Sequence, residues 1–152
     1  MAAHAFRTGS MQEAAKAALD LGPGGGPLVA DMVAKFLERR DYVLSRLDAI
    51  LGLRVAAPDG AFYVLPDCSA LVGPDVEADG FGALPDADAL CQYLLEVGHV
   101  ACVPGDAFGA PQCLRISYAA SQEVLAEAFD RIERCLSPAA LRRGNLPAAD
   151  TT

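Results

Sequence analysis

The spacing of apolar residues over the first third of the chain predicts two helices. Residues 12–21 are rich in alanine, which has the highest helix propensity, and four nearby glycines then end this segment. A helical period of apolar side chains follows over residues 27–51, at Val29, Met32, Val33, Phe36, Leu37, Val43, Leu44 and Leu47. Pro27 suits the first turn of this helix because its missing N–H needs no partner there, and Gly52 is placed to end it.

The apolar pattern then changes to that of strands. Residues 53–56 and 61–65 are short apolar runs separated by Pro58, Asp59 and Gly60, a combination that favours a tight turn. We therefore expect the two runs to form a hairpin. Residues 67–84 are rich in glycine, aspartate and proline, and are expected to form a long surface loop.

The second half of the chain begins with a helix expected over residues 87–97. Asp86 or Asp88 is suited to cap its N-terminus, because a carboxylate accepts hydrogen bonds from the free backbone N–H groups of the first turn. A strand is expected over residues 100–103, followed by a turn-rich loop over residues 104–109.

A strictly alternating segment, residues 114–119, predicts a half-buried strand. Ser121 starts a last long helix that runs to about Leu136, and the residues after Leu141 read as a frayed tail. Strands that alternate with long helices predict an α+β fold, a two-layer sandwich of a small, mostly antiparallel sheet packed against helices.

Composition limits the classes of function. The chain has 152 residues, of which 53% are apolar, and this suits one domain with a substantial core. Its net charge of -8 is spread along the sequence, which argues against nucleic acid as a partner. The apolar stretches are too short for a membrane span, and the first ten residues lack the apolar core of a signal peptide. We expect a soluble intracellular protein, in the plastid or the cytoplasm.

Few residues in the chain are suited to catalysis or metal binding. The five cysteines are odd in number and form no CxxC pair, which is typical of free thiols in a reducing compartment. With only two histidines, the sequence predicts no metal site. The only lysines, Lys16 and Lys35, lie on predicted helices and are expected to be solvated. No catalytic residue is identified.

Arg115 is the most distinctive candidate for binding. It stands in the predicted strand on the same face as Ser117 and Ala119, whose small side chains leave room above the sheet. A guanidinium there offers a rigid fork of N–H donors to a carboxylate. An ordinary solvent-facing arginine is the alternative.

Two further segments are weaker candidates. In the loop before the Arg115 strand, Gly105 and Gly109 allow close approach of the backbone to a ligand, with a plain turn as the alternative. Phe62 is a candidate for the edge of a pocket, with a core position in the hairpin as the alternative.

Four segments, taken in order, resemble class I aminotransferases of the aspartate aminotransferase superfamily, in the aspartate/prephenate branch found in plastids and bacteria. They are RRDYVLSRL (39–47), PDGAFYVLPD (58–67), VACVPGDAFG (100–109) and LRISYAAS (114–121). The likeness implies a C-terminal small domain over residues 11–137, with an unmatched segment over 1–10 and a flexible tail over 138–152. It further implies that Arg115 binds the substrate α-carboxylate, in a pocket lined by Phe62, Pro104, Gly105, Phe108 and Gly109.

The resemblance also implies a chemistry that depends on pyridoxal 5'-phosphate. In this family a lysine forms an imine with the cofactor, and an amino group passes from an amino acid to a 2-oxo acid. The implied substrates are aspartate, glutamate and 2-oxoglutarate, with prephenate as a further candidate, and the implied assembly is a homodimer. That lysine belongs to the family's large domain, so we expect no transamination by this chain alone. A non-catalytic carboxylate-binding or dimer-partner module and a truncated remnant are the alternatives.

Overall fold

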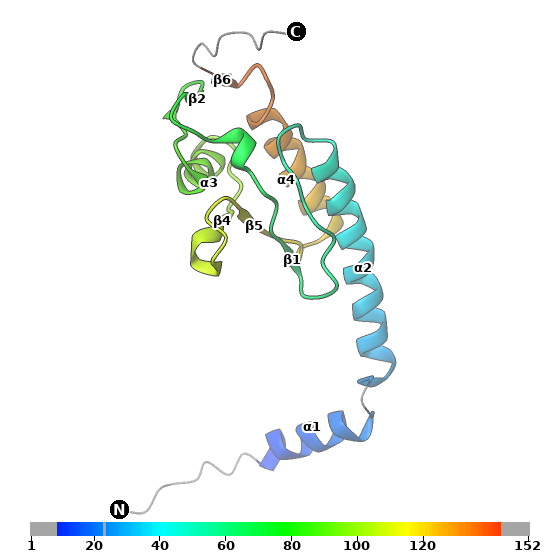
Figure 1. Cartoon of the computed structure of the whole chain (residues 1–152). Coiled ribbons are helices and arrows are strands. Elements are labelled where there is room, and N and C mark those ends of the chain that lie inside the picture. Colours follow the sequence, from blue (N-terminus) through cyan, green and yellow to red (C-terminus); the bar gives the residue numbers. More distant parts are fainter. Residues whose placement is uncertain (1–8, 23, 144–152) are drawn as a thin grey trace, which may run out of the picture. The chain divides into compact units, whose positions relative to one another are not determined.

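A computed structural model describes residues 9–22 and 24–143 of the chain (Figure 1). The chain divides into two compact units, residues 1–38 and 39–152. In the first unit, α1 spans Gly9–Asp20 and has no buried residue, and α2 begins at Gly26. Gly22, Gly25 and Gly26 have positive φ angles, which interrupt the helical backbone conformation between the two helices. The two predicted helices are confirmed, although α2 ends at Asp48, three residues before the predicted end.

The second unit contains the end of α2, two short 3₁₀ helices, two α-helices and six short strands among the described residues (Figure 1). In chain order these are β1 Tyr63–Val64, η1 Ser69–Leu71, β2 Val76–Ala78, β3 Gly82–Ala83, α3 Ala87–Glu96, β4 Val103–Pro104, η2 Gly105–Phe108, β5 Leu114–Ser117, α4 Gln122–Cys135 and β6 Leu141–Arg143.

The strands form two small antiparallel sheets. One has the order β1-β5-β4, and the other has the order β3-β2-β6. In the first sheet Tyr63 lies opposite Ser117, and Val103 lies opposite Arg115. The predicted α+β class, with small antiparallel sheets and helices, is confirmed.

Local sequence signals place the starts of α3 and α4. The Asp86 carboxylate accepts a hydrogen bond from the Ala89 N–H at 2.9 Å, so Asp86 rather than Asp88 is the N-cap of α3. The Ser121 hydroxyl accepts one from the Val124 N–H at 3.4 Å and caps α4. The core lies between these helices, the end of α2 and the first sheet, and its fully buried members include Val43, Leu47, Leu90, Tyr93, Leu94, Leu114, Phe129 and Ile132.

The predicted hairpin between residues 53–56 and 61–65 is wrong. Strand β1 pairs with β5 instead, and the first run contributes only an isolated bridge between Arg54 and Asp67. The hydrogen bonds explain the difference, because the Phe62 carbonyl accepts from the Tyr118 N–H at 2.8 Å and from the Ser117 hydroxyl at 3.4 Å. The expected partner strand is therefore replaced by one that lies far away in sequence.

The expected surface loop over residues 67–84 is also wrong, because it contains η1, β2 and β3. Val76 and Ala78 are buried while Glu77 between them is exposed, so β2 has one face in the core. The partner of β2 on its other side is β6, which lies where the sequence indicated no element. A three-residue strand whose partner, Leu141–Arg143, lies far along the chain leaves little local signal in the sequence.

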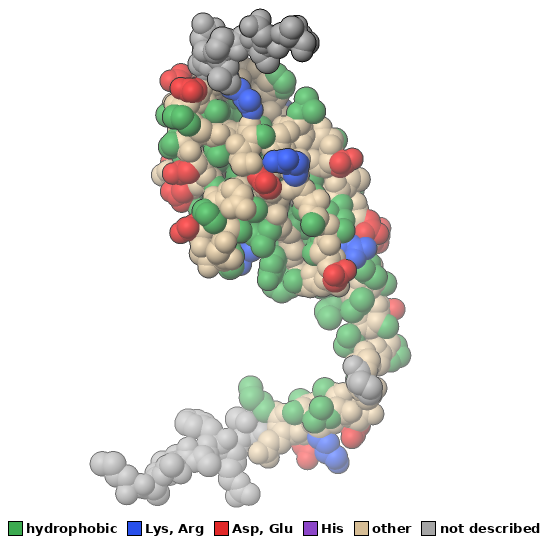
Figure 2. All heavy atoms as spheres, viewed as in Figure 1, with side chains coloured by type: hydrophobic (Ala, Val, Ile, Leu, Met, Phe, Trp, Pro, Cys, Tyr) green, Lys and Arg blue, Asp and Glu red, His purple; other side chains and the backbone are tan. Residues whose placement is uncertain are grey.

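The distribution of charged side chains on the surface agrees with their even spread along the sequence. Figure 2 shows acidic side chains scattered over the visible face, with no broad basic patch among them. No helix in the described part of the chain is long and apolar enough to cross a membrane.

Candidate functional site

Arg115 lies within β5, the central strand of the first sheet, and its side chain is half-buried. The strand alternates as predicted, because Leu114 and Ile116 are buried whereas Ser117 is exposed. The side chain of Arg115 therefore emerges on the face of the sheet opposite the core.

Two aromatic rings contact the Arg115 guanidinium. Its central carbon lies 4.5 Å from the centroid of the Phe108 ring and 5.4 Å from that of Tyr63. Both distances are within the range of cation–π attraction, which contributes about 0.5–2 kcal/mol depending on exposure. Among the described residues no carboxylate forms an ion pair with Arg115.

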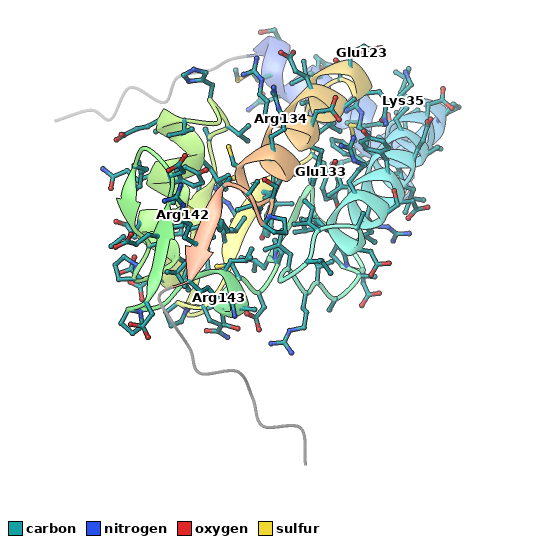
Figure 3. All side chains as sticks on the ribbon, turned by 90° about the horizontal axis from the view of Figure 1, so that it is seen from above. Lys35, Glu123, Glu133, Arg134, Arg142 and Arg143 are labelled. Carbon is teal, nitrogen blue, oxygen red and sulfur yellow. The ribbon has the colours of Figure 1, made fainter. Side chains whose placement is uncertain are left out.

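The absence of a carboxylate partner distinguishes Arg115 from most other arginines in the described ranges. The arginines that pair with an internal Asp or Glu are Arg40, Arg46, Arg54, Arg131 and Arg142. Figure 3 shows Arg142 and Arg143 on β6, where Arg142 pairs with Asp79 at 3.2 Å and Arg143 donates to the Ala70 carbonyl. Arg115 thus contacts two rings, and no residue in the described part of the chain accepts a hydrogen bond from its N–H groups.

The loop that follows β4 is fixed at Gly105. The Gly105 N–H donates to the Cys113 carbonyl at 2.8 Å, and the Gly105 carbonyl accepts from the Ala110 N–H at 3.0 Å. A Cβ at Gly105 would lie 2.2 Å from the Ala110 oxygen, so only glycine fits. Pro104 precedes it as the partner of Leu114 in the sheet, one position along from Arg115.

The same loop carries the nearer of the two rings. Phe108 is the last residue of η2, and Gly109 closes that turn with φ 73° while donating its N–H to the Asp106 carbonyl at 3.0 Å. Phe108 is 46% exposed, and its ring is the one that lies 4.5 Å from the guanidinium carbon of Arg115. Of the four loop residues predicted for the site, Phe108 contacts the Arg115 side chain, and Pro104 lies opposite Leu114 in the sheet.

Phe62 lies next to Tyr63, one of the two residues whose rings contact Arg115. Its ring is 50% exposed and meets the Tyr63 ring edge-on at 5.7 Å. The residue before it, Ala61, has φ 67°, an unfavourable angle for a residue with a Cβ, and its carbonyl accepts from the Tyr118 hydroxyl at 3.1 Å. This turn directs Phe62 outward and Tyr63 toward the arginine.

Tyr63, the residue after Phe62, contacts Arg115 directly, with its ring centroid 5.4 Å from the guanidinium carbon. Its position follows from the register, because Tyr63 lies opposite Ser117, and residues opposite each other in an antiparallel pair share a face of the sheet. This register requires that β1 pair with β5, whereas the hairpin predicted from the sequence paired residues 61–65 with residues 53–56.

The remaining reactive groups do not converge on this site. Lys16 and Lys35 are exposed on α1 and α2, respectively; Figure 3 labels Lys35. All five cysteines are free thiols, and burial raises the pKa of Cys68, Cys91 and Cys102 to about 12, which makes them poor nucleophiles. No group of His, Cys, Asp and Glu side chains suited to a metal ion occurs in the described residues.

An acidic hollow of about 420 Å³ adjoins the same loop. Its lining includes Asp86, Asp88, Val103, Pro104, Asp106 and Ala107. The three carboxylates disfavour an anionic ligand in that hollow.

Comparison with known proteins identifies a consistent group of relatives. The family model described as "Aminotransferase class I and II" matches residues 1–132. The chain is 51% identical over 125 residues to the bifunctional aspartate aminotransferase and glutamate/aspartate-prephenate aminotransferase of Petunia hybrida, which covers 82% of this chain and 26% of the relative. It is 47% identical over 125 residues to the aspartate aminotransferase of Pinus pinaster, covering 82% of this chain and 25% of the relative.

Solved structures give the same result. The aspartate aminotransferase of Rhizobium meliloti superimposes with a TM-score of 0.72 at 36% identity, over 82% of this chain and 30% of that one. The chain therefore spans about a quarter of the length of the curated relatives it matches.

Proposed function

The chain belongs to the class I and II aminotransferases, and we propose that Arg115 binds the α-carboxylate of the substrate in transamination. The observation that carries this proposal is the Arg115 guanidinium, which is held against two aromatic rings without an internal carboxylate among the described residues. Residues 11–137 would form the small domain that carries this arginine.

The geometry suits an orienting role. A guanidinium can donate two parallel N–H bonds to one carboxylate, which fixes the direction of the ligand as well as its position. A ligand held in this way presents its Cα–H bond in one orientation to groups outside the domain, and such orientation accounts for a large share of catalytic rate. Arg115 lies on the central strand, so the support for this fork is rigid.

Pyridoxal 5'-phosphate is the cofactor of this family, and it supplies an electron sink for amino-acid chemistry when bound. The residues present do not fit it, because a Schiff-base site needs an enclosed lysine, and both lysines of the chain are exposed on helices of the first unit. The Arg115 site lies in the second unit and contains no amine. We therefore assign the cofactor to protein outside these 152 residues.

Acidic amino acids and their 2-oxo acids are the proposed substrates. The names of the Petunia hybrida and Pinus pinaster relatives refer to aspartate, glutamate and prephenate as substrates. Each of these molecules, like 2-oxoglutarate, carries the carboxylate next to the reacting carbon that Arg115 would bind. We propose that groups outside this chain select the second carboxylate, and that the complete enzyme is a homodimer.

Titration of the full 152-residue chain with 2-oxoglutarate and with aspartate tests this function. Isothermal calorimetry or amide NMR shifts are expected to report binding by the native chain. Arg115→Ala is expected to weaken it at least tenfold, because a charge-assisted hydrogen bond contributes about 1.5–3 kcal/mol.

Arg54→Ala is the matched control, since it removes one exposed positive charge from the same unit. Equal loss in both variants would indicate a general effect of charge. Absence of binding by the native chain would remove the proposal.

A further inference from the structure

We propose that Phe108 and Tyr63 are positioning residues that fix the Arg115 guanidinium for carboxylate binding; this inference rests on the function proposed above. The two rings lie 4.5 and 5.4 Å from the guanidinium carbon. We call these three side chains the aromatic clamp. Phe108 has no group that can bind a carboxylate itself, so the effect of its ring is exerted through the arginine.

The two rings reach the arginine from separate, well-anchored segments. Phe108 is carried by η2, whose first residue, Gly105, donates its N–H at 2.8 Å to the carbonyl of Cys113, the residue just before β5. Tyr63 is carried by β1, which pairs with the other edge of β5 through Val64 and Ile116. The clamp is therefore assembled from both neighbours of the central strand.

The chemistry of cation–π contact explains why rings suit this purpose. A ring attracts the face of a guanidinium, whereas a carboxylate binds its N–H groups at the rim, in the plane. An aromatic support can therefore immobilise the side chain without occupying the donors that the ligand needs. It also shields one surface of the cation from water, and this strengthens the charge-assisted hydrogen bonds at the rim.

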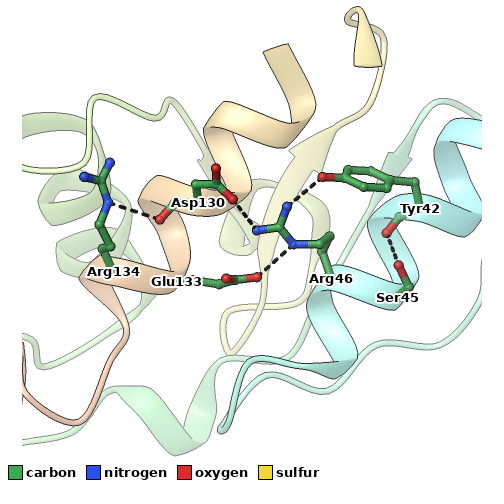
Figure 4. Close-up of polar contacts among 6 residues, drawn as sticks. All are labelled: Tyr42, Ser45, Arg46, Asp130, Glu133 and Arg134. Carbon is green, nitrogen blue, oxygen red and sulfur yellow. Dashed lines mark hydrogen bonds and ion pairs between the residues drawn. The ribbon is translucent and has the colours of Figure 1, made fainter. Parts of the chain in front are cut away.

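Arg46 provides a comparison within the same unit. Its guanidinium also lies over two rings, those of Tyr42 and Phe129, each at 5.7 Å. Its donors, however, are used by Glu133 at 2.8 Å and by Asp130 at 2.7 Å, so Arg46 joins two helices and is closed to a ligand (Figure 4). Arg115 combines the rings with free donors, as a binding arginine requires.

The test separates the clamp from binding itself. The Nε–Hε signal of Arg115 in the full chain, assigned by its disappearance in Arg115→Lys, is expected to be shifted upfield by the ring currents of Phe108 and Tyr63. Phe108→Leu should remove much of this upfield shift. Phe108→Tyr keeps a ring and should therefore retain the shift. Because Phe108 is 46% exposed, its replacement leaves the core intact.

Affinity for 2-oxoglutarate is then measured in the same variants. Because one ring contact is lost, Phe108→Leu is expected to bind 2-oxoglutarate roughly threefold to tenfold more weakly than the native chain. Phe108→Tyr is expected to bind it with native affinity. Phe81→Leu is the control, since it removes a ring that packs on Tyr93 at 5.3 Å in another part of the unit. That variant should bind like the native chain.

The outcomes are distinguishable. Native affinity in Phe108→Leu, with binding still dependent on Arg115, would overturn the clamp and leave the proposed function intact. Equal weakening in Phe108→Leu and Phe108→Tyr would also overturn it, because the ring would then have no specific effect. A native chain that binds no carboxylate would overturn the proposed function and this inference together, whatever the NMR shift of Arg115.

Discussion

Arg46 of α2 and Glu133 of α4 are joined by a hydrogen bond of 2.8 Å between Nε and Oε1, although 87 positions separate them in sequence (Figure 4). The same guanidinium donates to Asp130 at 2.7 Å and to the Tyr42 hydroxyl at 2.6 Å. These acceptors, Glu133 first, raise the pKa of Arg46 above its usual value, although burial opposes the shift. The arginine thus fastens the end of α2 to the last helix of the domain.

Replacement of Arg46 by alanine is expected to lower the free energy of unfolding by about 1–2 kcal/mol, because several partners and the packed stem are lost together. Arg131→Ala is the control, since Arg131 pairs with Glu127 within α4 alone and should cost about 0.5 kcal/mol or less. Urea denaturation followed by circular dichroism measures both. Equal losses would show that Arg46 forms only an ordinary surface pair.

Gly105→Ala is expected to destabilise the second unit by about 3 kcal/mol or more, because the added Cβ meets backbone oxygens that cannot move freely. The new atom would lie 2.2 Å from the Ala110 oxygen and 2.7 Å from the Cys113 oxygen. Gly60→Ala is the matched control, since nothing lies within 4 Å of its Cβ position. A thermal shift assay that ranks the two variants equally would contradict the close approach at Gly105.

Ala61→Gly is expected to raise the free energy of unfolding by about 0.5–1 kcal/mol, since glycine adopts a positive φ without steric cost. The φ angle of Ala61 is 67°. The same exchange at Ala56, which is exposed and has no positive φ, should lower stability by about 0.5–1 kcal/mol. Opposite signs in chemical denaturation are the diagnostic result, and equal signs would argue against the strained turn.

Stability is expected to fall above about pH 8.5, where thiols ionise in the unfolded chain. Burial raises the pKa of Cys68 to about 12, so the folded chain holds this proton while the unfolded chain releases it. The buried thiol therefore contributes fully to the free energy of unfolding below about pH 8.5. This contribution is lost as the pH rises, at up to about 1.4 kcal/mol per pH unit for each such thiol.

Urea denaturation between pH 8 and 10.5 under reducing conditions measures this slope. Cys68→Ala should make the slope shallower, independently of any loss of stability at pH 7. An unchanged slope would show that Cys68 ionises alike in both states.

The 152-residue chain supplied with pyridoxal 5'-phosphate, aspartate and 2-oxoglutarate is expected to form no oxaloacetate. Its lysines are exposed on α1 and α2 and lie outside the unit that carries Arg115. A coupled dehydrogenase assay measures the product, and a complete aspartate aminotransferase serves as the positive control. Turnover abolished by Lys35→Arg or Lys16→Arg would contradict the assignment of the cofactor to protein outside these residues.

Features that depend on neighbouring residues were predictable from the amino-acid sequence. The starts of α3 and α4 follow from Asp86 and Ser121, because each side chain accepts a hydrogen bond from an N–H three residues later. The alternation of β5 likewise placed Arg115 on the face opposite Leu114 and Ile116. The loop residues Gly105 and Phe108 were also predicted for the site, although the family resemblance was needed to give them a role.

The pairings between distant segments were not predictable from the sequence and are seen in the folded chain. Strand β1 pairs with β5 rather than with residues 53–56, and β2 is completed by β6 from the end of the domain. Tyr63 reaches Arg115 as a result of the first pairing. Strands of two or three residues carry too short a pattern to specify a partner, so the partner is chosen by burial and by the backbone hydrogen bonds that the assembled sheet makes available.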